Sequence, residues 1–118
     1  MKITEIVIPC FNLEGMLTFY ENVFNLSFQK IQINKGSIFI GTIDTIQLTL
    51  CPATIAGIEV KDNRHQLTFL VDDMLATIAK ATQYKGIILQ KAERVERFLQ
   101  ASIRDIDGNS IILKSFIT

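Results

Sequence analysis

Residues 8–28 read IPCFNLEGMLTFYENVFNLSF, and this stretch contains the signals that decide the fold. Apolar, β-branched residues alternate up to Cys10, which predicts a strand over residues 3–10. Asn12 follows as a helix N-cap. Apolar side chains then recur at helical spacing up to Phe24, so we expect an amphipathic helix that ends near Asn25. The stretch therefore predicts a strand followed directly by a helix.

Short strands are expected after this helix, separated by turns rich in Gly, Asn and Asp. They cover residues 26–33, 37–41 and 45–51. The intervening turns lie at residues 34–36 and 41–44, and a polar loop with Pro52, Gly57 and Asp62-Asn63 closes this half of the chain. The first half is therefore predicted to have the order βαβββ.

The second half repeats this order. We expect a strand over residues 65–71 and then a helix that Asp72 or Asp73 caps and Gly86 ends. Further strands are expected over residues 87–90, 97–104 and 110–116. Asp107-Gly108-Asn109 forms the last hairpin turn, since glycine and asparagine tolerate positive φ. A calcium loop is the competing interpretation, but the glycine and the acidic residue stand at the wrong positions for an EF-hand.

The repeat can be checked by offset. A shift of 61 residues places Ile6, Ile8, Cys10 and Asn12 on Leu67, Phe69, Val71 and Asp73, so strand parity and helix cap coincide. A period of about 60 residues is too long for a solenoid unit and indicates a duplicated half-domain. We expect a single domain, residues 1–118, with half-units of about 1–57 and 58–118.

Composition excludes several classes of protein. The 118 residues are 48% apolar and 20% charged, and twelve basic residues balance twelve acidic ones. Such a chain has no strong field to attract nucleic acid or an anionic membrane. No apolar run is long enough to span a bilayer. The first residues lack the features of a signal peptide, so we expect a cytoplasmic location.

Cysteine and histidine are scarce. Cys10 and Cys51 form no Cys-x-x-Cys pair and His65 is the one histidine, which argues against a structural zinc site. A disulfide is conceivable, but we expect two buried free thiols. The mixed-charge run from Lys91 to Arg97 indicates a solvated strand edge or a loop.

Three blocks resemble the vicinal oxygen chelate superfamily, which is the glyoxalase, bleomycin-resistance and extradiol-dioxygenase group. Residues 8–28 match its opening strand and helix, LTFLVDD (67–73) its fifth strand and helix cap, and DIDGNSIIL (105–113) its closing motif. Asn25 replaces a usual glycine, Ile106 a proline and Ile112 a glutamate. The resemblance implies an α+β fold of two βαβββ modules, with curled mixed sheets around a cleft and helices on the outer faces.

Strand alternation then selects the side chains that face the implied cleft. They are mostly polar: Glu5, Gln47, Thr49, Gln66, Thr68, Ser110 and Lys114. Phe39 and Phe98, on middle strands, are candidates to stack on a ligand, and otherwise belong to the core or to a dimer interface. Arg104 could clamp an anionic ligand, the alternative being a solvated residue at a strand end.

Metal-dependent relatives take one ligand from each of four strands. The matching positions here are Glu5, Gln47, Gln66 and Ile112. One carboxylate and two amides hold a divalent cation weakly, and isoleucine cannot ligate. We therefore expect a degenerate site with no metal and no other cofactor, while a weakly bound divalent metal stays an alternative. His65 stands one residue before a ligand position, so it faces away unless a bulge shifts the strand.

Glu5 is also a candidate general base, because burial beside apolar residues would raise its pKa. The alternative is a carboxylate that pairs with Lys114 or faces water. Together these expectations favour a metal-independent small-molecule-binding protein similar to the bleomycin-resistance branch, whose members are often homodimers. A divalent-metal-dependent lyase or isomerase of the glyoxalase type and a non-catalytic dimerising module are the alternatives.

Overall fold

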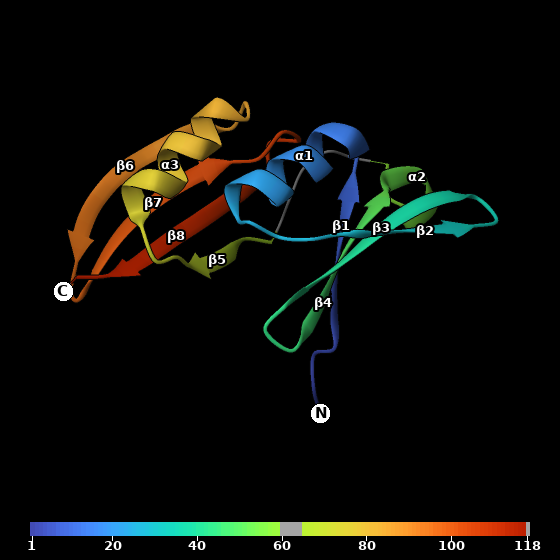
Figure 1. Ribbon diagram of the computed structural model, residues 1–118, viewed down its shortest axis with the longest axis horizontal. Coiled ribbons are helices and arrows are strands. Elements are labelled where there is room, and N and C mark those ends of the chain that lie inside the picture. Colours follow the sequence, from blue (N-terminus) through green and yellow to red (C-terminus); the bar gives the residue numbers. More distant parts are fainter. Residues whose placement is uncertain (60–64, 118) are drawn as a thin grey trace. The chain divides into compact units, whose positions relative to one another are not determined.

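The computed structural model describes residues 1–59 and 65–117, and their elements follow a βαβββ order twice (Figure 1). The chain divides into two compact units, Met1–Lys61 and Asp62–Thr118. Each unit holds a four-stranded mixed sheet with helices, so the expected α+β fold of two βαβββ modules is confirmed. The half-unit boundaries near residue 57 stay a prediction, and the expected loop residues Asp62-Asn63 lie outside the described residues.

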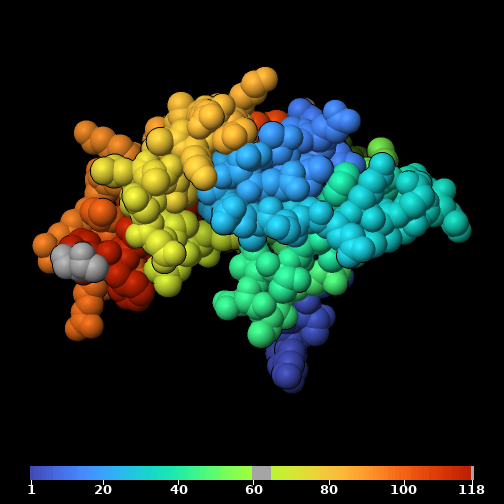
Figure 2. Space-filling view, viewed as in Figure 1, coloured from blue at the N-terminus to red at the C-terminus, as the bar shows by residue number. Residues whose placement is uncertain are grey.

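The first unit contains the elements β1 (Glu5–Cys10), α1 (Leu13–Val23), β2 (Gln29–Ile33), β3 (Gly36–Ile43), β4 (Ile46–Pro52) and α2 (Ala53–Ala56). Its sheet has the order β1-β4-β3-β2. β1 runs parallel to β4, and the other neighbours are antiparallel. The β2–β3 hairpin extends from the body of this unit (Figure 2).

The second unit contains β5 (Leu67–Leu70), α3 (Met74–Gln83), β6 (Ile87–Val95), β7 (Phe98–Arg104) and β8 (Ser110–Phe116). Its sheet has the order β5-β8-β7-β6, with β5 parallel to β8 and the other pairs antiparallel. Both sheets therefore place the first and last strands of a unit side by side. A parallel pair of this kind needs a crossover connection, which the helix and the two middle strands supply.

The helices begin as the sequence predicts and bury one apolar face. Asn12 Oδ1 accepts a hydrogen bond from Gly15 N at 3.0 Å, and Asp73 Oδ1 accepts one from Ala76 N at 3.1 Å. On α1 the side chains of Met16, Phe19 and Tyr20 are fully buried. Burying each such side chain contributes roughly 1.5–3 kcal/mol.

The apolar residues that the strands bury have the opposite parity from the expected polar positions, although Thr49 among the latter is buried as well. Leu48 and Leu50 on β4 are buried, as are Ile111 and Leu113 on β8. α3 contacts β6, β7 and β8, and covers one face of its sheet (Figure 1). None of the described helices has both the length and the apolar character that crossing a bilayer requires.

Two expected turns differ from the structure. α3 ends at Gln83, and the left-handed residue after it is Lys85 (φ 71°), not Gly86 as expected. Gly86 N instead donates to Ala81 O and Lys85 N to Thr82 O, which is the hydrogen-bond pattern of a Schellman motif. The glycine thus stands one residue beyond the left-handed position.

The turn expected at residues 41–44 is confirmed only at Asp44 (φ 55°), because β3 continues to Ile43. Gly41 is a strand residue against which the Phe28 ring packs; a Cβ atom there would lie 3.0 Å from Phe28 Cε1. Glycine marks a close approach here rather than a turn. The loop expected after β4 also contains the short helix α2, which Gly57 (φ 77°) ends.

The structure confirms the expectations for the two cysteines, the Lys91–Arg97 run and the last hairpin turn. Cys10 and Cys51 are free and buried, as predicted. β6 is longer than expected and takes in most of the Lys91–Arg97 run as an edge strand, which is the first of the two proposed interpretations. The Asp107-Gly108-Asn109 turn is confirmed, with Gly108 at φ 88°.

Candidate functional site

In the first unit, strand register brings three polar side chains together. Glu5 lies opposite Gln47, and Val7 opposite Thr49, in the parallel β1–β4 pair. Their side chains share one sheet face because residues two apart point the same way. We call Glu5, Gln47 and Thr49 the Glu5 cluster.

Hydrogen bonds fix the Glu5 carboxylate. Thr49 Oγ1 donates to Glu5 Oε2 at 2.5 Å, and Gln47 Nε2 donates to the same oxygen at 2.8 Å and to Thr49 Oγ1 at 3.2 Å. Thr49 is 3% exposed, whereas Glu5 is exposed. In the part of the chain that the structure describes, Glu5 Oε1 accepts no hydrogen bond. The cluster therefore fixes the carboxylate through one oxygen and leaves the other available to accept a hydrogen bond from a ligand.

Cys51 belongs to the same face, which strand analysis could have found by continuing the parity of Gln47 and Thr49. It lies opposite Pro9, and its thiol is 7% exposed. Burial raises the pKa of the Cys51 thiol above its usual value of 9.0, and the Glu5 charge raises it further. Cys51 is therefore a protonated, unreactive thiol at neutral pH.

An open pocket of about 560 Å³ lies on the first unit, between the segment Asn25–Gln29 and the β3 residues Ile40–Thr42. Ile40 and Thr42 are the register partners of Thr49 and Gln47, so the pocket borders the strand next to the Glu5 cluster. The sequence did not predict this pocket.

In the second unit, Gln66 Nε2 donates to Ser110 Oγ at 2.8 Å. Thr68 on β5 is exposed and lies opposite the half-buried Ile112. The expected polar positions of β5 and β8 thus do share a face. Ile112 contributes only apolar surface to it.

An aromatic and cationic group lies farther along this face. Lys114 Nζ lies 5.1 Å from the centroid of the Phe98 ring, and the Phe98 and Phe116 rings are 4.9 Å apart. Phe98 and Lys114 were expected candidates, while Phe116 was missed. Strand parity with Ser110, Ile112 and Lys114 would have selected it.

The other candidates are dispersed. Phe39 pairs with Leu50 and Lys30, so it lies on the helix-facing side of the first sheet and not with the Glu5 cluster. Arg104 is exposed at the end of β7, opposite Ser110.

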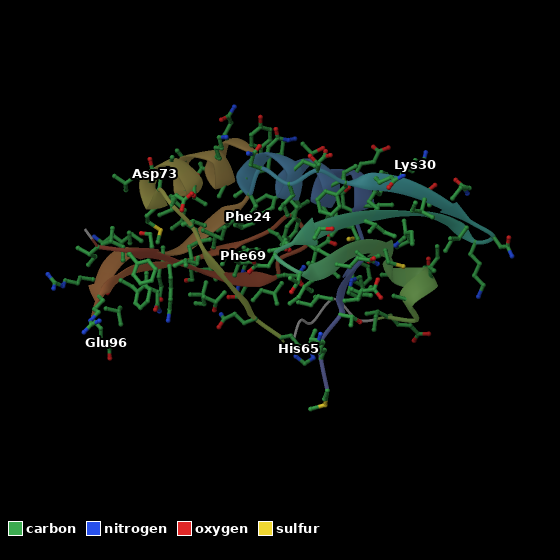
Figure 3. All side chains as sticks on the ribbon, turned by 60° about the horizontal axis from the view of Figure 1, so that its bottom comes forward. Phe24, Lys30, His65, Phe69, Asp73 and Glu96 are labelled. Atoms are coloured by element: carbon green, nitrogen blue, oxygen red, sulfur yellow. The ribbon has the colours of Figure 1, made fainter. Side chains whose placement is uncertain are left out.

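His65 is exposed and precedes β5, which begins only at Leu67 (Figure 3). A bulge in the strand could have turned the His65 side chain toward the expected ligand positions. His65 lies before the strand begins, so such a bulge does not apply to it. It lies on the segment that leads into β5 and not within the strand.

The four positions that match the metal ligands of relatives do not fit a divalent cation. Glu5 is the single carboxylate among them, and Gln47 donates its amide N–H to that carboxylate. Ile112 carries no ligand atom, and Gln66 is engaged with Ser110. Within residues 1–59 and 65–117, no three His, Cys, Asp or Glu side chains converge. Hard and borderline cations need more anionic or imidazole ligands than this set offers.

Comparison with known proteins adds the family context. The family model described as Glyoxalase/Bleomycin resistance protein/Dioxygenase superfamily matches residues 2–113. No curated protein sequence matches the chain.

Solved structures share the fold at low identity. One is a glyoxalase/bleomycin resistance protein/dioxygenase family enzyme from Burkholderia phytofirmans PsJN (TM-score 0.79, 15% identity, covering 99% of this chain and 100% of that one). An antibiotic binding protein from Streptomyces sp. CB03234 has a TM-score of 0.76 at 16% identity, with 99% and 97% of the two chains covered. A lactoylglutathione lyase from Agrobacterium tumefaciens has a TM-score of 0.70 at 17% identity, with 97% and 92% covered. At such identities the likeness shows a common fold, which hosts binding proteins and enzymes alike.

Proposed function

The chain belongs to the Glyoxalase/Bleomycin resistance protein/Dioxygenase superfamily, and from this premise we propose that it binds a small molecule without a functional metal site. In this respect it resembles the bleomycin-resistance branch rather than the metal-dependent lyases. Each unit offers one candidate binding face: the face of the first unit that carries the Glu5 cluster, and the face of the second unit that carries Lys114.

The proposal rests on one observation, namely which residues occupy the four metal-ligand positions and how they are hydrogen-bonded. Glu5 is held by Gln47 and Thr49 through hydrogen bonds that need no cation, and Ile112 has no ligand atom. A metal enzyme of this family polarises a substrate oxygen on its cation. Four positions with so few metal-binding groups support a role in ligand binding and not in metal-dependent catalysis.

The same residues suit recognition of a small molecule. Binding sites combine apolar surface with a few oriented polar groups. Here the exposed Glu5 carboxylate is fixed through its Oε2 atom, and Val7, two residues along β1, is 44% exposed. The ligand thus meets both a hydrogen-bond acceptor and an apolar surface on β1.

The Glu5 carboxylate is the one acid–base candidate in this cluster. Thr49 Oγ1 and Gln47 Nε2 both donate to one of its oxygens, so Glu5 is held as a hydrogen-bond acceptor, which supports a binding role for Glu5 over the general-base role.

Two experiments test the absence of a functional metal. Elemental analysis of purified protein is expected to find less than stoichiometric divalent metal. Thermal unfolding with added Ni²⁺, Zn²⁺, Mn²⁺ or Mg²⁺ is expected to leave Tm unchanged, because a ligand stabilises a fold only where it binds. A stoichiometric metal, or a metal-dependent rise in Tm, contradicts the proposal.

A ligand screen tests the binding role. Since an antibiotic binding protein shares the fold, we start from a panel of antibiotics that includes bleomycin, measured by isothermal titration calorimetry and mass spectrometry. A bound compound is expected to be recovered unchanged, and Glu5→Gln is expected to weaken its binding. Glu59→Gln, at an exposed position outside the cluster, is the matched control. Turnover of the compound, or lactoylglutathione lyase activity with any added metal, contradicts the proposal in favour of the enzyme.

We also propose a homodimer in the cytoplasm. Both statements rest on the family and on the composition of the chain. Sedimentation equilibrium is expected to give twice the mass of the 13.3 kDa chain. A monomer at micromolar concentration contradicts the dimer.

A further inference from the structure

Strand register gathers a second set of side chains around Lys114. In the β7–β8 pair Phe98 lies opposite Phe116 and Gln100 opposite Lys114, while Leu70 on β5 also pairs with Lys114. Paired residues project to the same side of a sheet. We call these five residues the Lys114 face.

The ammonium group of Lys114 is held in place but not neutralised. Its Nζ atom lies 5.1 Å from the centroid of the Phe98 ring, a cation–π contact, and the lysine is half-buried. In the described part of the chain no ion pair joins Lys114 to a carboxylate. The contact with the ring leaves the three N–H donors without an anionic partner.

Apolar surface surrounds this ammonium group on two sides. Leu70 is 62% exposed and Phe116 is 61% exposed, while the Phe98 ring lies 4.9 Å from that of Phe116 with the planes inclined by 33°. Phe116, the exposed member of this aromatic pair, offers a stacking surface for a planar molecule.

Two further charges lie on this side of the sheet. Arg104 is opposite Ser110, and Glu93 on β6 is opposite Gln100. Glu93 is two strands away from Lys114, a separation of about 10 Å at the usual strand spacing. At that distance exposed charges are largely screened, so Lys114 retains its attraction for an anion.

We propose that the Lys114 face selects ligands with a planar apolar body and a single anionic group, such as an aromatic carboxylate or sulfonate. The body stacks on Phe116 and contacts Leu70, and the anionic group accepts hydrogen bonds from Lys114 Nζ. This inference rests on the proposed binding function and names the class of ligand. A second copy of the chain is the rival occupant of the exposed apolar residues.

The probes for the test are naphthalene-2-sulfonate and naphthalene-2-sulfonamide, which share one planar body and differ in charge. Isothermal titration calorimetry measures both against the full chain. The wild type is expected to bind the sulfonate about tenfold more tightly, a difference of about 1.4 kcal/mol. High salt is expected to reduce this preference, because the ammonium group is only half-buried.

Variants then assign the preference to one residue. Lys114→Met is expected to abolish the preference and leave sulfonamide binding intact, whereas Lys114→Arg keeps it. Lys30→Met is the matched control, since Lys30 is exposed on β2 of the other unit. Circular dichroism confirms that each variant is folded, and Lys114→Gln replaces the methionine variant if that one is not.

The outcomes are distinct. Equal affinity for both probes, or a preference that survives in Lys114→Met, overturns the inference but leaves the proposed binding function standing. Binding of neither probe, together with dissociation of a dimer by Phe116→Ser in sedimentation, overturns it in favour of a second copy. The antibiotic screen and the metal analysis test the proposed function independently.

Discussion

Replacing Asp105 by asparagine is expected to destabilise the protein by about 2–3 kcal/mol. Asp105 is 3% exposed and closes the loop between β7 and β8. Its Oδ1 atom accepts hydrogen bonds from Asp107 N at 3.0 Å and Asn109 N at 2.9 Å, and its Oδ2 atom accepts one from Asn109 Nδ2 at 2.8 Å.

The magnitude follows from these three bonds. Hydrogen bonds to a charged acceptor contribute about 1.5–3 kcal/mol and neutral ones about 0.5–1.5 kcal/mol, so an amide weakens each backbone bond by about 1 kcal/mol. The new amide also places an N–H group against Asn109 Nδ2, where the carboxylate had an acceptor. That third bond is lost unless the side chains rearrange.

Equilibrium unfolding in urea, followed by circular dichroism, measures the change. Asp44→Asn is the matched control, because Asp44 is an exposed turn residue with φ 55° and asparagine tolerates that conformation. Its effect is expected to stay within about 0.5 kcal/mol. A double variant, Asp105→Asn with Asn109→Asp, restores one acceptor opposite one donor and is expected to recover part of the loss. A change below about 0.5 kcal/mol for Asp105→Asn would refute the reasoning.

Further predictions concern the backbone and the buried thiol. Gly41→Ala is expected to cost about 1–3 kcal/mol in the same unfolding assay, because its Cβ atom would lie 3.0 Å from Phe28 Cε1; no change would show that the ring moves freely. Lys85→Gly is expected to stabilise by about 0.5–1 kcal/mol, since φ is 71°, and a loss of stability contradicts this. Because the pKa of the Cys51 thiol is raised in the folded protein, the free energy of unfolding is expected to fall as the pH rises above 9.0, the usual thiol pKa. For the same reason iodoacetamide is expected to modify Cys51 slowly at neutral pH. Glu5→Gln removes a charge that raises this pKa, so it is expected to speed modification; an unchanged rate rules out the electrostatic contribution.

Much of the fold was predicted from local signals in the sequence. The caps at Asn12 and Asp73 were predicted because their side chains act on amides two or three residues away. Asn25 stands where the family usually has a glycine, and its φ of 54° is the left-handed conformation that glycine and asparagine tolerate best. Strand parity also predicted that Glu5, Gln47 and Thr49 share a face.

Other features depend on partners distant in the sequence. Gly41 resembled a turn residue, and only the packing of Phe28 on β3 shows that it marks a close approach. Phe39 was a candidate for ligand stacking until its pairing with Leu50 placed it on the helix-facing side. A pattern along one strand does not reveal which neighbour lies opposite.

The sequence by itself determined the two βαβββ modules, the helix caps and which residues stand at the family's metal-ligand positions, because these follow from nearest neighbours and from side-chain chemistry. Only the tertiary structure decided how those polar groups are satisfied. The Glu5 carboxylate is held by hydroxyl and amide groups more than 40 residues away in the chain, at sequence separations of 44 and 42. Lys114 meets the Phe98 ring because β7 and β8 pair in one register. Hydrogen bonds and ring contacts of this kind require atoms within a few ångströms, and strand pairing alone brings such distant residues that close.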